Sequence, residues 1–354
     1  MTQIPEQARQ YYLSQSGAID NITLRTFAVP KPKPNQVLVK IHAVSLNVRP
    51  LLQLGILLML MATPCDAIRR QFRDIMIVYS QYPGVVRDKP VPVSDGAGEV
   101  VAIGEDVRKW KVGDRVAANF ALDHISGDTS VEIQHTMLGG GVDGVLTEYQ
   151  VFPEYVRVTA WMSLQGPVPV KAGDFVLLQG TGGVSIFALQ FAVASGAAVI
   201  VTSSSNDKLA LVKKLGAKYT INYKETPDWD KEVLKITNGE GVHHVLELGG
   251  PATLVKSINS VRLSGHVHII GAIAGIDARE EAPLGVKILF KDARLRGIIV
   301  GSRTMFEDMN RALATHQIKP LIDTVFSFEE ATAAYKHLES QKHIGKVVIR
   351  VASN

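Results

Sequence analysis

The stretch Phe175–Ser185, FVLLQGTGGVS, joins a short apolar run to a cluster of glycines and the start of a helical pattern. The run Val176–Leu178 predicts a buried parallel strand, and the glycines after it predict a tight turn before a helix that begins at Val184. Glycines in such a turn let the backbone approach a diphosphate, while the N–H groups and positive dipole end of the helix face the anion. The stretch therefore predicts a dinucleotide-binding turn, and an ordinary strand-to-helix turn is the alternative.

A second apolar run, Ala197–Ser203, has the sequence AAVIVTS and lies roughly 20 residues downstream, where a dinucleotide fold places its ribose-binding residue. An acidic residue at the end of this strand would hydrogen-bond the 2′-hydroxyl of NAD and repel a 2′-phosphate. This chain has hydroxyls there instead, from Thr202 to Ser205, followed by Lys208. The pattern favours NADP(H) over NAD(H), and a serine-rich loop with a solvated lysine is the alternative.

Length and composition are those of a globular protein with room for two domains. The chain has 354 residues, of which 46% are hydrophobic and 20% are charged. The net charge of +4 is spread along the chain, which excludes a basic arm for nucleic acid. The single cysteine, Cys65, excludes an intrachain disulfide and is typical of a reducing compartment. The N-terminus lacks the layout of a secretory signal, so we expect a cytoplasmic protein that acts on a small molecule.

The N-terminal part has the pattern of a small β domain. Residues Gln36–Val44 alternate apolar and polar side chains after a proline-rich loop, which predicts a strand of an antiparallel sheet. Two more short strands are expected within Ser94–Gly104 and Trp110–Ala117, separated by turns. These segments together favour a barrel-like domain.

After Ala172 the chain alternates between apolar strands and helical patterns. The expected strands are Phe175–Leu178, Ala197–Thr202, Tyr219–Asn222, Val242–Leu246, His266–Ile270 and Leu295–Val300. Helices are expected at Ser185–Ser195 and at Asn206–Leu215, and such crossovers predict a doubly wound parallel sheet. The tail predicts a helix around Phe328–Ser340 and a closing strand at Lys346–Val351.

These segments resemble the medium-chain dehydrogenase/reductase superfamily, in particular its zinc-independent quinone oxidoreductase-like and zinc-type alcohol dehydrogenase-like members. The matching stretches include VLVKIHAVSLN, SDGAGEVVAIGEDVRKWKVGDRV, GVDGVLTEYQV, VLLQGTGGVS, TSSSNDKL, LELGGPATL and GKVVI. The resemblance implies an α/β fold in which a Rossmann doubly wound parallel sheet is joined to a GroES-like β-barrel catalytic domain. It implies a GroES-like domain at residues 1–158, to which residues 316–354 return, and a Rossmann NADP-binding domain at 159–315. It also implies a homodimer.

The resemblance carries roles over to individual residues. The implied cofactor residues are Gly180, Gly182, Gly183 and Val184 at the diphosphate, Ser203, Ser204, Lys208 and Tyr223 around the 2′-phosphate, and Gly271 and Val300 along the nicotinamide. Asn47 and Thr159 match family residues beside the nicotinamide, although an asparagine at such a position also serves as a turn or capping residue. Tyr79 and Tyr82 are candidate proton donors, with packed aromatic rings as the alternative.

Zinc is not expected. Metal-bearing relatives have a cysteine near the SLN motif at 45–47 and a His-Glu pair near Ser94 and Asp95, and this sequence has neither. Without a Lewis acid for alcohol oxidation, the implied reaction is hydride transfer from NADPH to an enone, a quinone or a related carbonyl compound. The alternatives are an alcohol dehydrogenase-type enzyme and an inactive homologue that binds NADPH.

Two departures from the family pattern support the inactive alternative. Residues Val48–Phe72 form an insertion of about two dozen residues beside the expected nicotinamide. Its apolar run, Leu51–Ala62, is too short to cross a bilayer, which takes roughly 20 residues. After Val158, relatives have a loop and a helix that this chain lacks.

Overall fold

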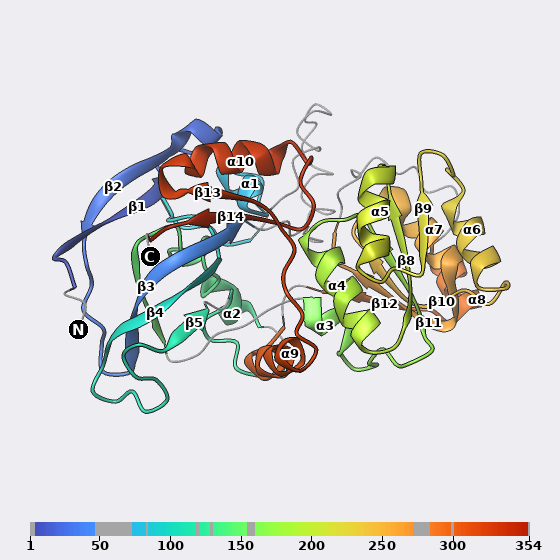
Figure 1. Cartoon of the computed structure of the whole chain (residues 1–354), viewed down its shortest axis with the longest axis horizontal. Coiled ribbons are helices and arrows are strands. Elements are labelled where there is room, and N and C mark those ends of the chain that lie inside the picture. The colour runs from blue at the N-terminus through green and yellow to red at the C-terminus, as the bar shows by residue number, and fades with distance from the viewer. Residues whose placement is uncertain are drawn as a thin grey trace.

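The structure is a computed structural model that describes residues 4–46, 73–82, 84–117, 120–127, 130–153, 160–271, 284–298 and 301–352. Two large β-sheets lie on opposite sides of the molecule, and helix α9 (Arg303–Thr315) lies between them (Figure 1). No helix in these ranges is both long and apolar enough to cross a membrane.

The first sheet combines strands from both ends of the chain. Its strands are β3 (Gln36–Leu46), β4 (Asp95–Ile103), β5 (Arg115–Ala117), β6 (Tyr149–Pro153), β13 (Ile322–Ser327) and β14 (Lys346–Arg350). They are ordered β13-β14-β3-β4-β5, and β6 also pairs with β3. Strand β14 runs antiparallel to β3, with Val348 opposite Ser45, so the C-terminal residues complete the N-terminal sheet.

The alternating pattern of β3 gives this sheet its buried face. Val37, Val39 and Ile41 are buried in one cluster with Tyr335 and Leu338 of helix α10 (Ala331–Glu339). Figure 1 shows α10 lying across this sheet. The remaining elements of this part are β1 (Gln7–Leu13), β2 (Ile22–Ala28), α1 (Arg73–Val78) and α2 (Val131–His135).

The second sheet is fully parallel, which confirms the predicted doubly wound sheet. Its strands are β7 (Phe175–Gln179), β8 (Ala198–Ser203), β9 (Tyr219–Asn222), β10 (Val242–Glu247), β11 (Val261–Ile269) and β12 (Arg294–Gly297). The order is β12-β11-β10-β7-β8-β9, so the chain starts at the centre, moves to one edge and returns to build the other half. The neighbours β7 and β10 therefore form the switch point, where such sheets bind their ligands.

Helices cover both faces of the parallel sheet, as its apolar strands require. One face packs on α3 (Ala160–Leu164), α4 (Gly183–Ala194), α5 (Asn206–Lys214) and α9. The other face packs on α6 (Trp229–Ile236), α7 (Pro251–Ser260) and α8 (Leu284–Lys291). The domain boundary expected at 158/159 lies outside the described residues, and the division of the chain into 1–158, 159–315 and 316–354 remains a prediction.

Three expected strands differ most in their bounds, and the others differ by at most two residues at either end. Within Trp110–Ala117 only Arg115–Ala117 is extended, because Gly113 turns the chain at a φ of +96°. Strand β11 begins at Val261, five residues before the expected start at His266. Strand β12 spans Arg294–Gly297, one residue earlier at its start than expected.

Candidate active site

The glycine turn presents an open backbone surface at the start of α4. Gly180 has a φ of +74°, and Gly182 precedes the first helical residue, Gly183. A Cβ added at Gly180 or Gly182 would meet no atom within 4 Å. No side chain caps the helix at Gly182, so the first-turn N–H groups and the dipole face this open space. The turn therefore has the room and the electrostatics that a diphosphate requires.

A buried polar network lies behind the turn, at the ends of β7 and β10. The side chain of Glu247 is 0% exposed, and its carboxylate accepts hydrogen bonds from the Gln179 amide at 2.7 Å, the Gly250 N–H at 2.8 Å and the Thr253 hydroxyl at 2.6 Å. The Ser257 hydroxyl donates a fourth. Each buried acceptor is thus satisfied, and the network fixes the loop after β10 at the switch point.

The same network supports the position of Gly271. The buried Gly271 donates its N–H to the backbone carbonyl of Glu247 at 3.1 Å. Gln179 accepts the N–H groups of Leu248 and Gly249, both at 2.9 Å. Sequence reasoning missed this network. A signal for it was available, because Gln179 and Glu247 end the two strands that meet at the switch point.

The residues expected around a 2′-phosphate lie together where β8 and β9 end. Ser203 is 4% exposed, and its carbonyl accepts the N–H of Tyr223 at 3.1 Å. Ser204 is half-buried next to it, and the Ser205 hydroxyl caps α5 by accepting the N–H of Lys208 at 3.4 Å. The structure therefore brings these residues to one end of the strand pair, beside the glycine turn.

The Lys208 ammonium reaches a C-terminal segment. Its Nζ donates to the carbonyl of Gln341 at 3.2 Å and to that of His343 at 3.0 Å. Burial lowers the pKa of Lys208 from its ordinary value. We call residues 341–346, which join α10 to β14, the C-terminal strap. Lys208 thus ties the strap to the parallel sheet.

The strap also contacts the glycine turn directly. Gly345 donates its N–H to the carbonyl of Thr181 at 3.1 Å, and Gly182 and Gly345 form an isolated parallel bridge. A Cβ on Gly183 would lie 3.1 Å from Cδ of Lys346, the last residue of the strap. The expected cofactor site is therefore bordered by the C-terminal strap.

Asp95 is expected to lie near the position at which metal-bearing relatives have zinc ligands. Its carboxylate accepts the Ser94 hydroxyl at 3.3 Å and pairs with the Lys346 ammonium at 3.4 Å. Within the described ranges, no group of three or more His, Cys, Asp or Glu side chains is arranged to hold a metal ion. Asp95 is an ion-pair partner in this arrangement.

The two candidate tyrosines pack against the core of the first sheet. The Tyr79 hydroxyl donates to the Glu339 carboxylate of α10 at 3.0 Å. The Tyr82 hydroxyl lies 3.9 Å from the Met137 sulfur, and the Arg73 guanidinium lies over the Tyr82 ring at 5.2 Å. These contacts fit packed aromatic rings better than a proton donor facing the glycine turn.

Several expected site residues lie outside the described residues. They are Asn47, Thr159, Val300 and the insertion Val48–Phe72. Val184 is described, and it is half-buried in the first turn of α4.

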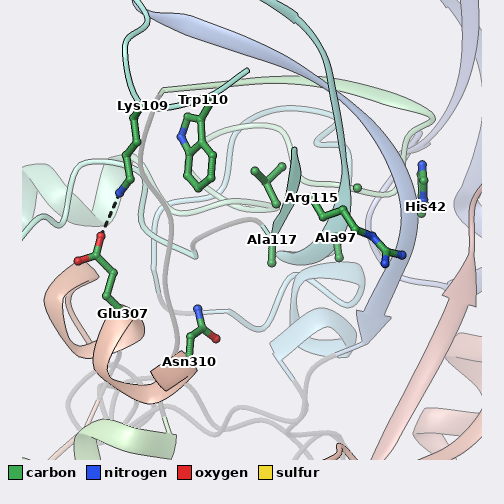
Figure 2. Close-up of a pocket in the computed structure, with 10 residues that line it drawn as sticks. His42, Ala97, Lys109, Trp110, Arg115, Ala117, Glu307 and Asn310 are labelled. Carbon is green, nitrogen blue, oxygen red and sulfur yellow. Dashed lines mark hydrogen bonds and ion pairs between the residues drawn. The ribbon is translucent and has the colours of Figure 1, made fainter. Parts of the chain in front are cut away.

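A cavity of about 450 Å³ lies between the first sheet and α9, and we call it the α9 pocket (Figure 2). Its lining includes His42, Lys109, Trp110, Arg115, Glu307 and Asn310. Lys109 and Glu307 pair at 3.1 Å across the pocket mouth and so connect the first sheet to α9. No local pattern in the sequence predicts this pocket, because its walls come from segments about 200 residues apart.

Comparisons with known proteins match both halves of the chain. A model of the alcohol dehydrogenase GroES-like domain matches residues 33–162, and a model described as zinc-binding dehydrogenase matches residues 183–315. A zinc-type alcohol dehydrogenase-like protein of Schizosaccharomyces pombe is 40% identical, over 94% of this chain and 96% of that protein. A quinone oxidoreductase of Sus scrofa is 27% identical, over 91% of each chain.

Solved structures agree with these matches. The crystal structure of a putative alcohol dehydrogenase from Sinorhizobium meliloti 1021 has a TM-score of 0.84 at 31% identity, and the match covers 99% of this chain and 100% of that one. A quinone oxidoreductase from Pseudomonas syringae has a TM-score of 0.73 at 24% identity, and the match covers 97% of this chain and all of that one. At this identity the similarity supports the fold and not the activity. The expected combination of a GroES-like domain with a Rossmann-like parallel sheet is confirmed.

Proposed function

This chain belongs to the medium-chain dehydrogenase/reductase superfamily of oxidoreductases, and from that premise we propose that it transfers hydride from NADPH to an enone, a quinone or a related carbonyl compound without zinc. The observation that carries the proposal is the open glycine turn beside a serine-ended strand β8 and Lys208. NADP(H) is the expected cofactor.

The residues of the turn fit a dinucleotide diphosphate. Gly180, Gly182, Gly183 and Val184 would hold it through backbone groups, because the space beside Gly180 and Gly182 is free of protein atoms. Gly271, anchored on the Glu247 carbonyl, would border the nicotinamide with Val300. When bound, the nicotinamide supplies the hydride. The protein orients it and shields it from water, and Asn47 and Thr159 are proposed to lie beside it.

The choice of NADPH rests on what stands at the end of β8. Ser203 offers a hydroxyl where an NAD-binding relative would offer a carboxylate, so no negative charge opposes a 2′-phosphate. Ser204, Lys208 and Tyr223 would complete this site. Replacing Ser203 with Asp should weaken NADPH relative to NADH, and an unchanged ratio would refute the assignment.

Zinc independence rests on the donor set at the family's metal position. Asp95 is paired with Lys346, and the neighbouring Ser94 is a poor zinc ligand. Reduction of an enone needs no metal hydroxide or metal alkoxide, since the hydride goes to the β carbon and a proton follows. Water is the proposed proton source, because the hydroxyls of Tyr79 and Tyr82 face Glu339 and Met137.

We also propose a cytoplasmic homodimer. Strand β12 is the edge of the parallel sheet among the described residues, and helix α8 leaves Leu289 73% exposed and Phe290 78% exposed. An unpaired strand edge next to exposed apolar side chains favours burial against a second copy. Sedimentation equilibrium should give twice the mass of one chain.

The experiment that tests the function is a fluorescence titration with NADPH, followed by addition of a panel of quinones and enones. Binding followed by NADPH oxidation supports the proposed reductase. Binding without oxidation of NADPH, but with oxidation of alcohols by NADP⁺, favours the alcohol dehydrogenase-type alternative. Binding without either reaction favours an inactive homologue, and the absence of binding contradicts all three.

A further inference from the structure

The α9 pocket has the size of a small-molecule site and walls of mixed character. Its volume of about 450 Å³ falls within the range of ligand pockets, roughly 300 to 1,000 Å³. Ala97, Val116 and Ala117 give it an apolar wall on the first sheet, and Trp110 and Asn310 add an indole and an amide. Figure 2 shows these side chains around one space.

The charges that line the pocket are unbalanced. Three lining residues have basic side chains, which are His42, Lys109 and Arg115. Among the lining residues that the structure describes, Glu307 alone has a carboxylate. Lys109 already pairs with Glu307 at 3.1 Å. The Arg115 guanidinium has no hydrogen-bond or ion-pair partner in the part of the chain that the structure describes. Even its cross-strand neighbour Glu99 forms no ion pair with it.

Arg115 and the Lys109–Glu307 pair lie at different sides of the pocket. In Figure 2 the Arg115 side chain extends along the sheet toward His42, away from Lys109 and Glu307. The guanidinium is exposed to the space of the pocket, with a planar fork of donors that matches a carboxylate. The positive charge at this side is therefore available to a ligand.

The pocket also has a defined relation to the glycine turn. Ala97 lines the pocket from β4 and lies two residues from Asp95 on the same face of that strand, roughly 7 Å away at 3.3 to 3.4 Å per residue. Asp95 pairs with Lys346, whose methylene chain lies beside Gly183. The pocket therefore lies on the side of the first sheet that adjoins the proposed cofactor site.

We propose that the α9 pocket binds a carboxylate at the far end of the hydride acceptor, with Arg115 as the residue that selects acidic acceptors. The proposal rests on the proposed reductase function, and it narrows the substrate class to enones or quinones with an anionic tail. The indole of Trp110 and the apolar wall would contact the chain between the carboxylate and the reacting double bond. His42 would lie near the bound carboxylate.

The test compares two acceptors that differ only in charge, (E)-9-oxodec-7-enoic acid and its methyl ester. With the native chain and NADPH, kcat/KM for the acid should exceed that for the ester by roughly two- to fivefold, the value expected for one exposed guanidinium–carboxylate pair. Arg115→Gln should lower kcat/KM for the acid to that of the ester and leave the ester unchanged. Arg115→Lys should retain part of the preference.

Arg311→Gln is the matched control, because Arg311 follows Asn310 on α9 and its guanidinium pairs with Asp308 on the helix surface. This variant should leave kcat/KM unchanged for both the acid and the ester. Equal kcat/KM for acid and ester in the native chain, or a preference that survives Arg115→Gln, would overturn the proposal.

Calorimetric titration of the acid into the protein separates this proposal from the reductase function. If the acid, the ester and the panel of quinones and enones all fail to oxidise NADPH, the reductase function is contradicted, and the pocket is tested by binding of the acid alone. Roughly two- to fivefold tighter binding of the acid to the native chain than to Arg115→Gln supports the pocket. Equal affinities overturn it, provided that the two proteins melt at the same temperature.

Discussion

The ammonium of Lys346 lies 3.4 Å from the carboxylate of Asp95, although the two residues are 251 positions apart. The methylene chain of the same lysine covers Gly183 at the start of α4, where a Cβ would lie 3.1 Å from its Cδ. One side chain therefore lies against both the glycine turn and the first sheet. The chain's two halves are joined at the place where the cofactor is proposed to bind.

Removing this charge should cost little stability. The Lys346 and Asp95 side chains are 19% and 30% exposed, so we expect the pair to contribute about 1 kcal/mol or less. Lys346→Met keeps the methylene contact with Gly183 and should lower the free energy of unfolding by that amount. A double-mutant cycle with Asp95→Asn, measured by urea unfolding, isolates the coupling. Strictly additive effects would show that the pair contributes nothing.

Gly182→Ala should separate binding from folding. Gly182 has a φ of −76°, and an added Cβ meets no protein atom within 4 Å, so the variant should fold with nearly unchanged stability. The same methyl group would occupy the space proposed for the diphosphate and should weaken NADPH binding by at least tenfold. Thermal melting and NADPH titration of one preparation measure both effects. Unchanged affinity would exclude Gly182 from the cofactor site.

Glu247→Gln should destabilise the protein. The carboxylate accepts four hydrogen bonds in a fully buried site, and a glutamine amide would turn its NH₂ group toward either the Gly250 N–H or the Gln179 amide. One buried donor then loses its acceptor, which costs about 2 kcal/mol. Urea unfolding beside the exposed control Glu240→Gln measures the difference. Equal midpoints for the two variants would contradict the role given to this network.

Two stacked histidines in the parallel sheet predict a loss of stability in acid. His244 and His268 are buried, and their ring nitrogens lie 3.1 Å apart. Burial is the main cause that lowers the pKa of His244 to about 4 and that of His268 to about 3. The basic neighbours that oppose protonation of His244 are His266, His243 and Arg262, while Asp174 favours it. Those that oppose protonation of His268 are His244, His266 and Arg296.

The direction in which stability changes with pH follows from the pKa of about 6.5 that histidine has in the unfolded chain. As the pH falls below 6.5, the unfolded chain binds protons that the folded chain does not, so stability is lost until the pH reaches 4 for His244 and 3 for His268. His268→Gln should flatten this dependence between pH 6.5 and 5 in urea unfolding. The exposed control His316→Gln should leave the pH dependence unchanged. If the free energy of unfolding changes equally with pH in the native chain and both variants, His268 does not cause the loss of stability in acid.

The parallel sheet could be predicted because each strand has its own local signal. The run VLL before the glycines and the run AVIVTS are apolar on both faces, as a strand covered by helices must be. Strands β2 and β13 lack such a signal, because most of their side chains are exposed and the alternation is weak. The sequence therefore predicted the strands that build the cofactor site and missed those at the periphery.

The residues of the candidate site could be predicted only where they lie within one short segment of the sequence. The glycine turn and Ser203 belong to single strand ends, and the structure has them next to each other. The contacts of Lys208 with the strap join residues more than 130 positions apart. The α9 pocket likewise unites β5 with a helix near the other end of the chain. Such long-range contacts follow from how the sheets pack, which no local pattern encodes.

The most direct test is a titration of the native chain and of Lys208→Met with NADPH and with NADH. The native chain should bind NADPH at least tenfold more tightly, because Lys208 and the serines at the end of β8 are proposed to bind the 2′-phosphate. Lys208→Met should lose most of that preference by weakening NADPH alone, while the exposed control Lys214→Met keeps it. Equal or tighter binding of NADH by the native chain would contradict the account.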